Sequence, residues 1–252
     1  MPTRDTAWPA GTPCWIDYSA ADLEAAQAFY ADVLGWTYTA GQPEFGGYLT
    51  CLRNDQAAAG MVPRMDPSHP ANWTTYFATG DADAAVAQIT KAGGSVLSAP
   101  MDVGPLGRMA MALDPEGNTF GLWQAGEHTG VTIYNEPGAL IWNEGAVDDP
   151  TAAKAFYTAV FGYRFDEVEG SGGYSIFATD GGPLGGLFAH KASSPKGWTA
   201  CFSVASTDAA VAAVERGHGK VTTAPQDTPN GRYAVVEDAW GAPFSVMQAL
   251  PG

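Results

Sequence analysis

Two carboxylates stand two residues after a tryptophan, in stretches of sequence that repeat each other. Trp15 and Asp17 form the first pair, and Trp142 and Glu144 form the second. Because the side chains of a strand alternate between its two faces, each tryptophan is expected to share a face with its carboxylate. Such a pair can bind a cationic aromatic molecule by cation–π attraction and a charge-assisted hydrogen bond. It can also supply a general acid or base, because burial beside indole rings raises the pKa of a carboxyl group.

Each pair opens a strand-then-helix pattern that must position it. The stretch 14–18 reads as a strand, and residues 22–34 carry apolar side chains at helical spacing before Gly35. The same pattern recurs at 141–144 and 149–161. Further matches at an offset of about 125 residues extend the repeat through the rest of the chain. The sequence therefore predicts an internal duplication.

The duplication divides the chain of 252 residues into two domains. Each domain contains two modules, and each module reads as a strand, a helix and further strands joined by hairpin turns. The predicted modules are 13–62, 72–125, 140–190 and 197–249. They form a first domain at 10–125 and a second domain at 140–250, joined by a linker at 126–139.

Three motifs resemble those of the vicinal-oxygen-chelate (VOC) superfamily, which includes glyoxalase I, extradiol dioxygenases and bleomycin-resistance proteins. They are the D-L-x-x-A-x-x-F-Y-x-x-x-L-G-W helix from Asp22, the mid-domain Gly93-Gly94, and the G-R-x-x-x-x-x-D-P-x-G-N close from Gly107. The resemblance implies an α+β fold of two tandem VOC domains, each made of paired βαβββ modules with concave mixed sheets. More narrowly, the chain is similar to two-domain actinobacterial members labelled hydroxylase or glyoxalase-like. A shared fold leaves the activity open.

The metal enzymes of this superfamily hold a divalent ion with His, Glu or Gln at four inward strand positions. The resemblance places these positions on Trp15, Gly60, Thr74 and Gly121 in the first half, and on Trp142, Gly186, Thr199 and Ser245 in the second. No histidine falls on a predicted core strand, and we interpret His69, His128, His190 and His218 as solvated side chains of loops and strand or helix ends. We therefore expect neither a metal site nor a cofactor.

The composition limits the partners. Hydrophobic residues make up 46% of the chain and the formal net charge is −15, so nucleic acid and anionic membrane surfaces are not expected partners. Three widely spaced cysteines, Cys14, Cys51 and Cys201, read as core thiols of a reducing compartment. Neither a signal peptide nor a spanning segment is evident, and we expect a cytoplasmic protein. Tandem fusion supplies each domain with a partner, so we expect a monomer rather than a homodimer.

Other aromatic side chains are expected to line the same trough as the two pairs. With Trp15 and Trp142 they form the predicted ligand-binding set: Tyr48, Trp73 and Trp123 in the first half, and Tyr174, Trp198 and Met247 in the second. Such a trough suits a flat aromatic molecule, including a cationic one.

The leading hypothesis is a metal-independent protein that binds an apolar or aromatic small molecule, such as an antibiotic or secondary metabolite, for sequestration, resistance or delivery. The alternative is a tailoring enzyme for natural products that performs cyclisation, isomerisation or hydroxylation with Asp17 or Glu144 as catalytic residues. A glyoxalase-like lyase is the third hypothesis, and it would require the metal ligands that the transferred positions lack.

Overall fold

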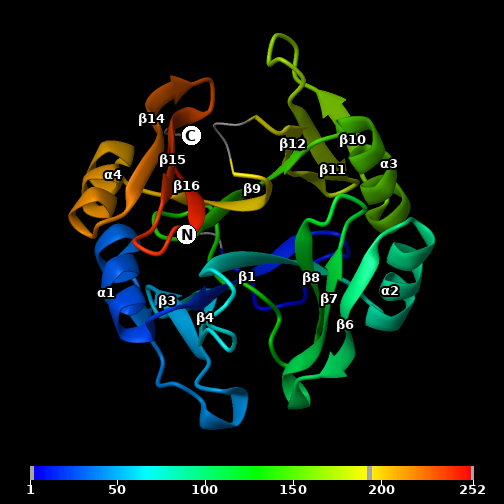
Figure 1. Ribbon diagram of the computed structural model, residues 1–252, viewed down its shortest axis with the longest axis horizontal. Coiled ribbons are helices and arrows are strands. Elements are labelled where there is room, and N and C mark those ends of the chain that lie inside the picture. The colour runs from blue at the N-terminus through cyan, green and yellow to red at the C-terminus, as the bar shows by residue number, and fades with distance from the viewer. Residues whose placement is uncertain (1–2, 192–194, 251–252) are drawn as a thin grey trace.

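A computed structural model describes residues 3–191 and 195–250 (Figure 1). The first half forms an eight-stranded mixed sheet in the order β2-β3-β4-β1-β5-β8-β7-β6. Its elements are β1 (Pro13–Ala20), α1 (Leu23–Leu34), β2 (Thr37–Tyr38), β3 (Leu49–Arg53), β4 (Gln56–Pro63), β5 (Asn72–Ala78), α2 (Ala82–Lys91), β6 (Ser95–Asp102), β7 (Gly107–Leu113) and β8 (Thr119–Ala125).

The second half repeats this sheet in the order β10-β11-β12-β9-β13-β16-β15-β14. Its elements are β9 (Leu140–Val147), α3 (Pro150–Phe161), β10 (Arg164–Glu167), β11 (Ser175–Thr179), β12 (Gly182–Ala189), β13 (Gly197–Ser203), α4 (Thr207–Arg216), β14 (Lys220–Thr228), β15 (Gly231–Glu237) and β16 (Pro243–Ala249). The predicted α+β fold of four βαβββ modules is therefore confirmed.

The first helix of each half begins and ends where the sequence motif requires. Asp22 accepts a hydrogen bond from the Ala25 amide at the start of α1, and Asp149 caps α3 in the same way. Both helices end at a glycine with a left-handed backbone, at φ 70° in Gly35 and φ 72° in Gly162. These caps fix the helices directly after the strands that carry the tryptophan–carboxylate pairs.

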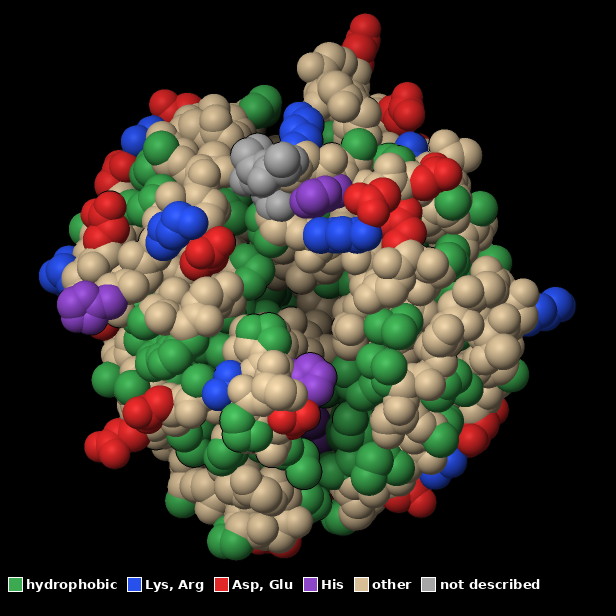
Figure 2. Space-filling model, viewed as in Figure 1, with side chains coloured by type: hydrophobic (Ala, Val, Ile, Leu, Met, Phe, Trp, Pro, Cys, Tyr) green, Lys and Arg blue, Asp and Glu red, His purple; other side chains and the backbone are tan. Residues whose placement is uncertain are grey.

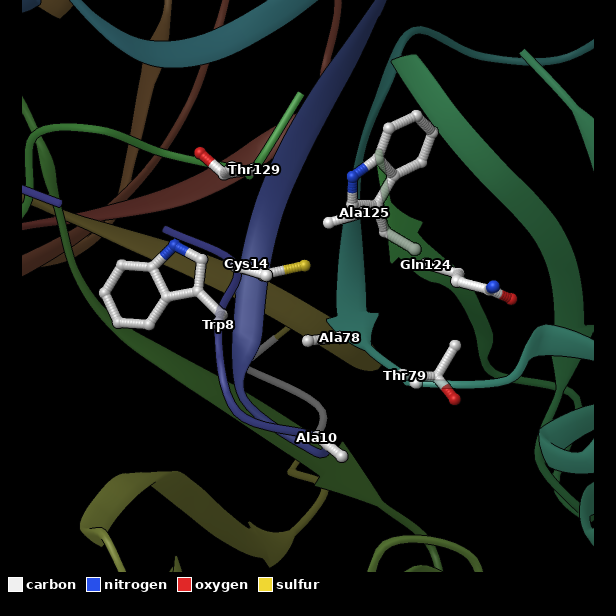
Figure 3. A pocket seen from close by; sticks show the side chains of 11 residues that line it. Trp8, Ala10, Cys14, Ala78, Thr79, Gln124, Ala125 and Thr129 are labelled. Carbon is white, nitrogen blue, oxygen red and sulfur yellow. The ribbon is translucent and has the colours of Figure 1, made fainter. Parts of the chain in front are cut away.

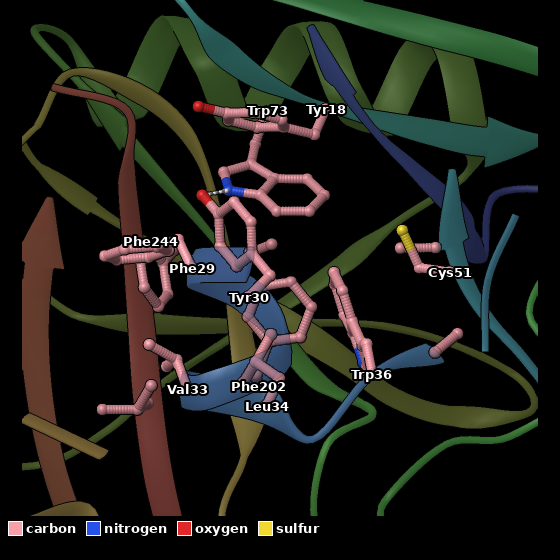
Figure 4. Close-up of a cluster of buried hydrophobic side chains, with 14 of the residues drawn as sticks. Tyr18, Phe29, Tyr30, Val33, Leu34, Trp36, Cys51, Trp73, Phe202 and Phe244 are labelled. Carbon is pink, nitrogen blue, oxygen red and sulfur yellow. Dashed lines mark hydrogen bonds between the residues drawn. The ribbon is translucent and has the colours of Figure 1, made fainter. Parts of the chain in front are cut away.

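The two halves share their hydrophobic cores. Helix α1 lies beside α4, and α2 lies beside α3, so each helix pair joins one half of the chain to the other (Figure 1). In one core, Tyr30 of α1 packs against Phe244 of the second half, and Trp36 packs against Phe202 (Figure 4). Burial of such rings removes large apolar areas from water, which stabilises the arrangement of the two sheets.

Two buried carboxylates join the halves in related ways. Asp238 Oδ2 accepts hydrogen bonds from the hydroxyl groups of Tyr18 and Tyr30 across the junction. Asp114 Oδ2 accepts one from Tyr157 at 2.9 Å. Both aspartates also accept backbone amides of their own turns, so the turn that closes each half is tied to the first helix of the other.

Acidic side chains are scattered around the rim of the face shown in Figure 2, and hydrophobic side chains surround a hollow near its centre. Within the described residues, no helix is long and apolar enough to cross a membrane.

Candidate functional site

The first tryptophan–carboxylate pair is held together by a tyrosine from the neighbouring hairpin. Trp15 Nε1 donates to the Tyr48 hydroxyl at 2.8 Å, and that hydroxyl donates to Asp17 Oδ1 at 2.6 Å. The indole also reaches Asp17 Oδ1 directly, at 2.7 Å. Gly60 lies beneath, because a Cβ at this position would stand 1.8 Å from the Tyr48 hydroxyl oxygen. The small residue is therefore required for the phenol to reach the carboxylate.

The second half repeats this tryptophan–tyrosine–carboxylate relay. Trp142 Nε1 donates to the Tyr174 hydroxyl at 2.8 Å, and the hydroxyl donates to Glu144 Oε1 at 2.9 Å. A Cβ at Gly186 would likewise stand 1.8 Å from the Tyr174 hydroxyl oxygen. We name the sheet face that carries Asp17 or Glu144 the carboxylate face of each half. It is opposite the face covered by the helices.

A further tyrosine reaches each carboxylate, but from a different strand in each half. In the first half Tyr76 of β5 lies close enough to Asp17 for its hydroxyl group to lower the pKa of this carboxyl group. In the second half Tyr233 of β15 donates to Glu144 Oε2 at 2.8 Å. Since that phenol proton is used, Ser245 Oγ at 2.9 Å must donate to the Tyr233 oxygen.

Neither Tyr76 nor Tyr233 was among the residues predicted from the sequence. Strand alternation could have found Tyr76, which stands two residues after the inward position Thr74. Tyr233 lies on β15 and reaches over Ser245 of β16 to Glu144 of β9. No local sequence pattern indicates a contact between strands so far apart in the sheet.

Burial raises the pKa of both carboxyl groups. For Asp17 the raising effect of burial outweighs the hydrogen bonds from Tyr48, Trp15 and Tyr76, which lower the pKa. For Glu144 burial likewise outweighs the hydrogen bonds from Tyr233 and Tyr174. Each carboxyl group is therefore easier to protonate than in water, which suits an acid or base as well as a ligand-binding group.

His128 closes the carboxylate face of the first half. Its imidazole contacts the Trp15 indole edge-on, with ring centroids 4.3 Å apart, and lies 5.3 Å from the Trp123 ring. Trp123 Nε1 also donates to the His128 carbonyl at 2.8 Å. Burial lowers the pKa of His128 to about 4. Our interpretation of His128 as a solvated loop side chain was wrong, because tertiary packing of the segment after β8 decides its position.

The two tryptophans of the pairs differ in exposure. Trp15 is only 3% exposed and belongs to a cluster with Tyr76 and Trp123. Trp142 is half-buried, and no aromatic ring within residues 3–191 and 195–250 is found packed against it. The first half thus fills its own carboxylate face, whereas the second leaves its indole partly open.

Trp73 and Trp198 lie on the helix faces of their sheets, which corrects their predicted place beside Trp15 and Trp142. Trp73 stands opposite Tyr18 in the sheet register, one residue out of phase with Asp17. Its Nε1 donates to the Tyr30 hydroxyl at 3.0 Å inside the shared core (Figure 4). Trp198 donates to Tyr157 in the same way, at 2.9 Å. Both indoles therefore stabilise the junction between the halves.

The remaining predicted residues lie near the carboxylates. Tyr48 and Tyr174 belong to the two relays, and Trp123 belongs to the cluster around Trp15. Met247 stands opposite Tyr233 in the register of β15 and β16.

The donor set does not fit the divalent ion of the superfamily's metal enzymes. The transferred positions Gly60 and Gly186 offer no side-chain donor, and tyrosine hydroxyls occupy the space above them. Each half contributes one carboxylate whose oxygens already accept phenol protons. Across the part of the chain that the structure describes, no three His, Cys, Asp or Glu residues are grouped so as to hold a metal ion.

Two hollows lie away from the carboxylates. A cavity of about 240 Å³ is lined by Trp8, Cys14, Thr79 and Gln124, among others, between the N-terminal segment and the ends of β5 and β8 (Figure 3). Its lining includes neither Asp17 nor Tyr48. A wider groove of about 400 Å³ runs between α1 and α4 and is bordered by Trp240.

Comparison with known proteins identifies the family. Residues 14–122 and 139–246 each match the model described as Glyoxalase/Bleomycin resistance protein/Dioxygenase superfamily. "Putative glyoxylase CFP32" of Mycobacterium tuberculosis (strain CDC 1551 / Oshkosh) is 38% identical over 261 residues, covering 100% of this chain and 99% of the relative. "Anthracycline biosynthesis protein DauV" of Streptomyces sp. (strain C5) is 36% identical over 263 residues, covering 96% of this chain and 95% of the relative.

Solved structures share the fold at low sequence identity. The 2,3-dioxygenase LapB from Pseudomonas sp. KL28 superposes with a TM-score of 0.65 at 14% identity, covering 98% of this chain and 94% of that chain. The Mn(II)-bound glyoxalase from Novosphingobium aromaticivorans gives a TM-score of 0.67 at 14% identity, covering 96% and 83%.

Proposed function

Because the chain belongs to the Glyoxalase/Bleomycin resistance protein/Dioxygenase superfamily, we propose that it binds an aromatic small molecule beside Glu144 on the carboxylate face of its second half. The observation that carries this proposal is the half-buried Trp142 next to a carboxylate held by two phenols. An open indole face provides a stacking surface for a flat ring. Each oxygen of Glu144 accepts one phenol and retains capacity for a donor of the ligand.

The names of the relatives suggest a chemical class for the ligand. Two relatives are named anthracycline biosynthesis proteins, DauV and DnrV, and anthracyclines contain a planar polycyclic aromatic system. We therefore propose a planar polyketide-type aromatic compound as the ligand, bound for sequestration, resistance or delivery.

Binding is independent of a metal ion in this proposal. The glycines of the relays support this, because tyrosine hydroxyls take the space that a ligating side chain would need. Dialysis against a chelator is expected to leave the melting temperature and probe affinity unchanged. One stoichiometric divalent ion whose removal lowers either quantity would contradict it.

Titration of paired anthraquinones tests the binding proposal. One probe carries an alkylammonium side chain and the other a neutral hydroxyalkyl chain of equal length. A hydrogen bond to a charged group contributes about 1.5–3 kcal/mol, so Glu144→Gln should weaken the cationic probe roughly tenfold or more. Asp17→Asn serves as the control in the first half, because it also replaces a carboxylate by an amide of the same shape. Equal affinity of both probes for wild type and Glu144→Gln would show that the carboxylate does not contact ligand.

An acid–base tailoring enzyme is the second candidate, favoured by the burial that raises the pKa of Glu144. In this case Glu144 would exchange a proton with a carbonyl or hydroxyl group of the substrate. Product formation from a polyketide aromatic, with a pH profile lost in Glu144→Gln, would support it. Native mass spectrometry of protein purified from its own host distinguishes the two candidates. A binding protein should carry an intact bound molecule, whereas an enzyme should release its product.

We also propose a monomer, because the contacts of α1 with α4 and of α2 with α3 give each half its partner within one chain. Sedimentation at micromolar concentration should give the mass of one chain, and a stable dimer would contradict this.

A further inference from the structure

The cavity between the N-terminal segment and the ends of β5 and β8 is separate from both carboxylates. Its volume is about 240 Å³, and its lining includes Trp8 of the N-terminal segment, Cys14 of β1, Ala78 of β5 and Gln124 of β8 (Figure 3). We call it the N-terminal cavity. Gly11 donates its amide to the Ala78 carbonyl at 2.8 Å, so the N-terminal segment is fixed against β5 as one wall of the cavity.

Two indoles line the N-terminal cavity, and both are held in place through their ring nitrogens. Trp8 Nε1 donates to the Val131 carbonyl at 3.2 Å, and Trp123 Nε1 donates to the His128 carbonyl at 2.8 Å. Trp8 also packs edge-on against Tyr134, with ring centroids 5.1 Å apart. Because both N–H groups are used, the indoles offer only their carbon surfaces to a bound molecule.

The N-terminal cavity carries no charge. All of its lining residues belong to the described part of the chain, and none of them is acidic, basic or a histidine. Burial raises the pKa of the Cys14 thiol, so this group stays neutral as well. The formal net charge of −15 therefore comes from residues outside the cavity. Such a lining favours a neutral molecule, because moving a charged one into it from water is costly.

The side-chain amide of Gln124 gives the lining a hydrogen-bond donor. Its Oε1 accepts the Ala82 amide at 2.9 Å at the start of α2. Within residues 3–191 and 195–250, no acceptor is found for its Nε2. The hydroxyl group of Thr79, by contrast, donates to the Asp81 carbonyl at 3.0 Å. A molecule that satisfies the lining must therefore present an acceptor, such as a carbonyl oxygen, to Gln124.

We infer that the N-terminal cavity binds a neutral aromatic molecule of one or two rings that bears a carbonyl group, separately from the ligand of the second half. The rings lie against Trp8 and Trp123, and the carbonyl oxygen accepts a hydrogen bond from Gln124 Nε2. Pockets for drug-sized ligands begin at about 300 Å³, so this smaller cavity excludes the three fused rings of an anthraquinone. Ala7 and Ala10 both line the cavity and are exposed, so the molecule enters beside the N-terminal segment.

Titration with 1-indanone tests this inference, with indane as the matched hydrocarbon that lacks the carbonyl oxygen. In proton–nitrogen NMR spectra of the wild-type protein, 1-indanone should shift the indole signals of Trp8 and Trp123 and the side-chain amide of Gln124. The indole signal of Trp142 should not move. Indane should shift the same indole signals but bind about fivefold more weakly, because one neutral hydrogen bond is missing. The three-ring probe 1,4-dihydroxyanthraquinone should leave the Trp8 signal unchanged.

A cavity-filling variant changes the volume. Ile141 precedes Trp142 as Cys14 precedes Trp15, so the repeat already carries the larger side chain at this place in the second half. Cys14→Ile should therefore fold, as circular dichroism can verify, and should weaken 1-indanone about fivefold or more by filling the cavity. Ile141→Val is the matched control in the second half and should leave the affinity within about twofold.

Gln124→Glu changes the donor alone. It keeps an oxygen that accepts the Ala82 amide but removes the N–H groups, so the preference for 1-indanone over indane should disappear.

The outcomes separate this inference from the proposed function. Absence of saturable 1-indanone binding at about 1 mM, or signal shifts at Trp142 in place of Trp8, would overturn the inference whatever the anthraquinones do. Equal affinities of wild type for 1-indanone and indane, or a folded Cys14→Ile protein with wild-type affinity, would also overturn it. Binding of 1-indanone beside Trp8 in a protein that binds no anthraquinone would support the inference and refute only the proposed function.

Discussion

The hydroxyl group of Tyr233 lies 2.8 Å from Oε2 of Glu144, whereas the residue at the position of Tyr233 in the first half is Met109. The phenol of the first half comes from Tyr76 on another strand instead. Both halves therefore contain a carboxylate close to two tyrosine hydroxyl groups, but one of these tyrosines comes from a different strand in each half.

Removal of the Tyr233 hydroxyl should raise the pKa of Glu144 further. Burial already raises this pKa, and the hydrogen bond from Tyr233 is the first of the effects that lower it. A hydrogen bond to a charged group contributes about 1.5–3 kcal/mol, so Tyr233→Phe should shift the titration of Glu144 upward by about one pH unit. Carbon-detected NMR of the Glu144 carboxyl group measures this shift, with Glu144→Gln for assignment.

Ser245→Ala is the matched control for Tyr233→Phe. It removes the other partner of the Tyr233 hydroxyl but keeps the donation to Glu144, so the carboxyl titration should barely move. Identical titrations of Glu144 in wild type and Tyr233→Phe would show that the phenol proton is directed to Ser245 instead.

Asp238→Asn should destabilise the junction between the halves. Its Oδ2 accepts the hydroxyl groups of Tyr18 and Tyr30, both buried, and an amide nitrogen in this place cannot accept either proton. An unsatisfied buried hydroxyl costs about 1–3 kcal/mol, so urea denaturation should show a loss of about 2–3 kcal/mol in the free energy of unfolding. Asp180→Asn, which removes an exposed ion pair with Arg164, should cost under about 1 kcal/mol. Equal losses in the two variants would mean that the buried tyrosines find other acceptors.

His128 should make the protein less stable as the pH falls. Its pKa is lowered from 6.5 to about 4 because burial disfavours the imidazolium ion. The unfolded chain therefore binds a proton before the folded chain does, and the contribution of His128 to stability falls between about pH 6.5 and pH 4. The raised pKa values of Asp17 and Glu144 act in the opposite direction, since their contributions fall as the pH rises.

The variant His128→Phe isolates this effect. It keeps a ring between Trp15 and Trp123 but cannot be protonated. The difference in unfolding free energy between variant and wild type should grow in favour of the variant by about 1–2 kcal/mol from pH 7 to pH 4. A constant difference across this range would show that His128 is already solvated in the folded protein.

Local patterns predict the fold where a helix or strand carries clear sequence signals of its own. Asp22 and Gly35 mark the ends of α1, and the alternation around Trp15 and Asp17 fixes the face on which both lie. The repeat then carries the same elements into the second half. The sheet order and the two modules of each half follow from the family resemblance together with these signals.

Site residues were predicted correctly only where a single strand or hairpin determines their position. Tyr48 and Tyr174 reach their carboxylates across a glycine of the next strand, which the repeat makes visible. Trp73 was assigned to the wrong face of the sheet. It is adjacent in sequence to the inward position Thr74 and therefore points to the opposite face, as its pairing with Tyr18 shows. His128 lies in an irregular segment, whose packing depends on rings that come from β1 and β8.

A crystal structure of the protein with 1,4-dihydroxyanthraquinone is the most direct measurement of the central claim, that the second half binds a flat aromatic molecule without a metal ion. The account predicts one probe per chain, its ring system stacked on Trp142 and one of its oxygens hydrogen-bonded to Glu144, while Tyr76 and His128 remain packed against Trp15. A probe seated beside Asp17, or held through a metal ion in either half, would contradict the account.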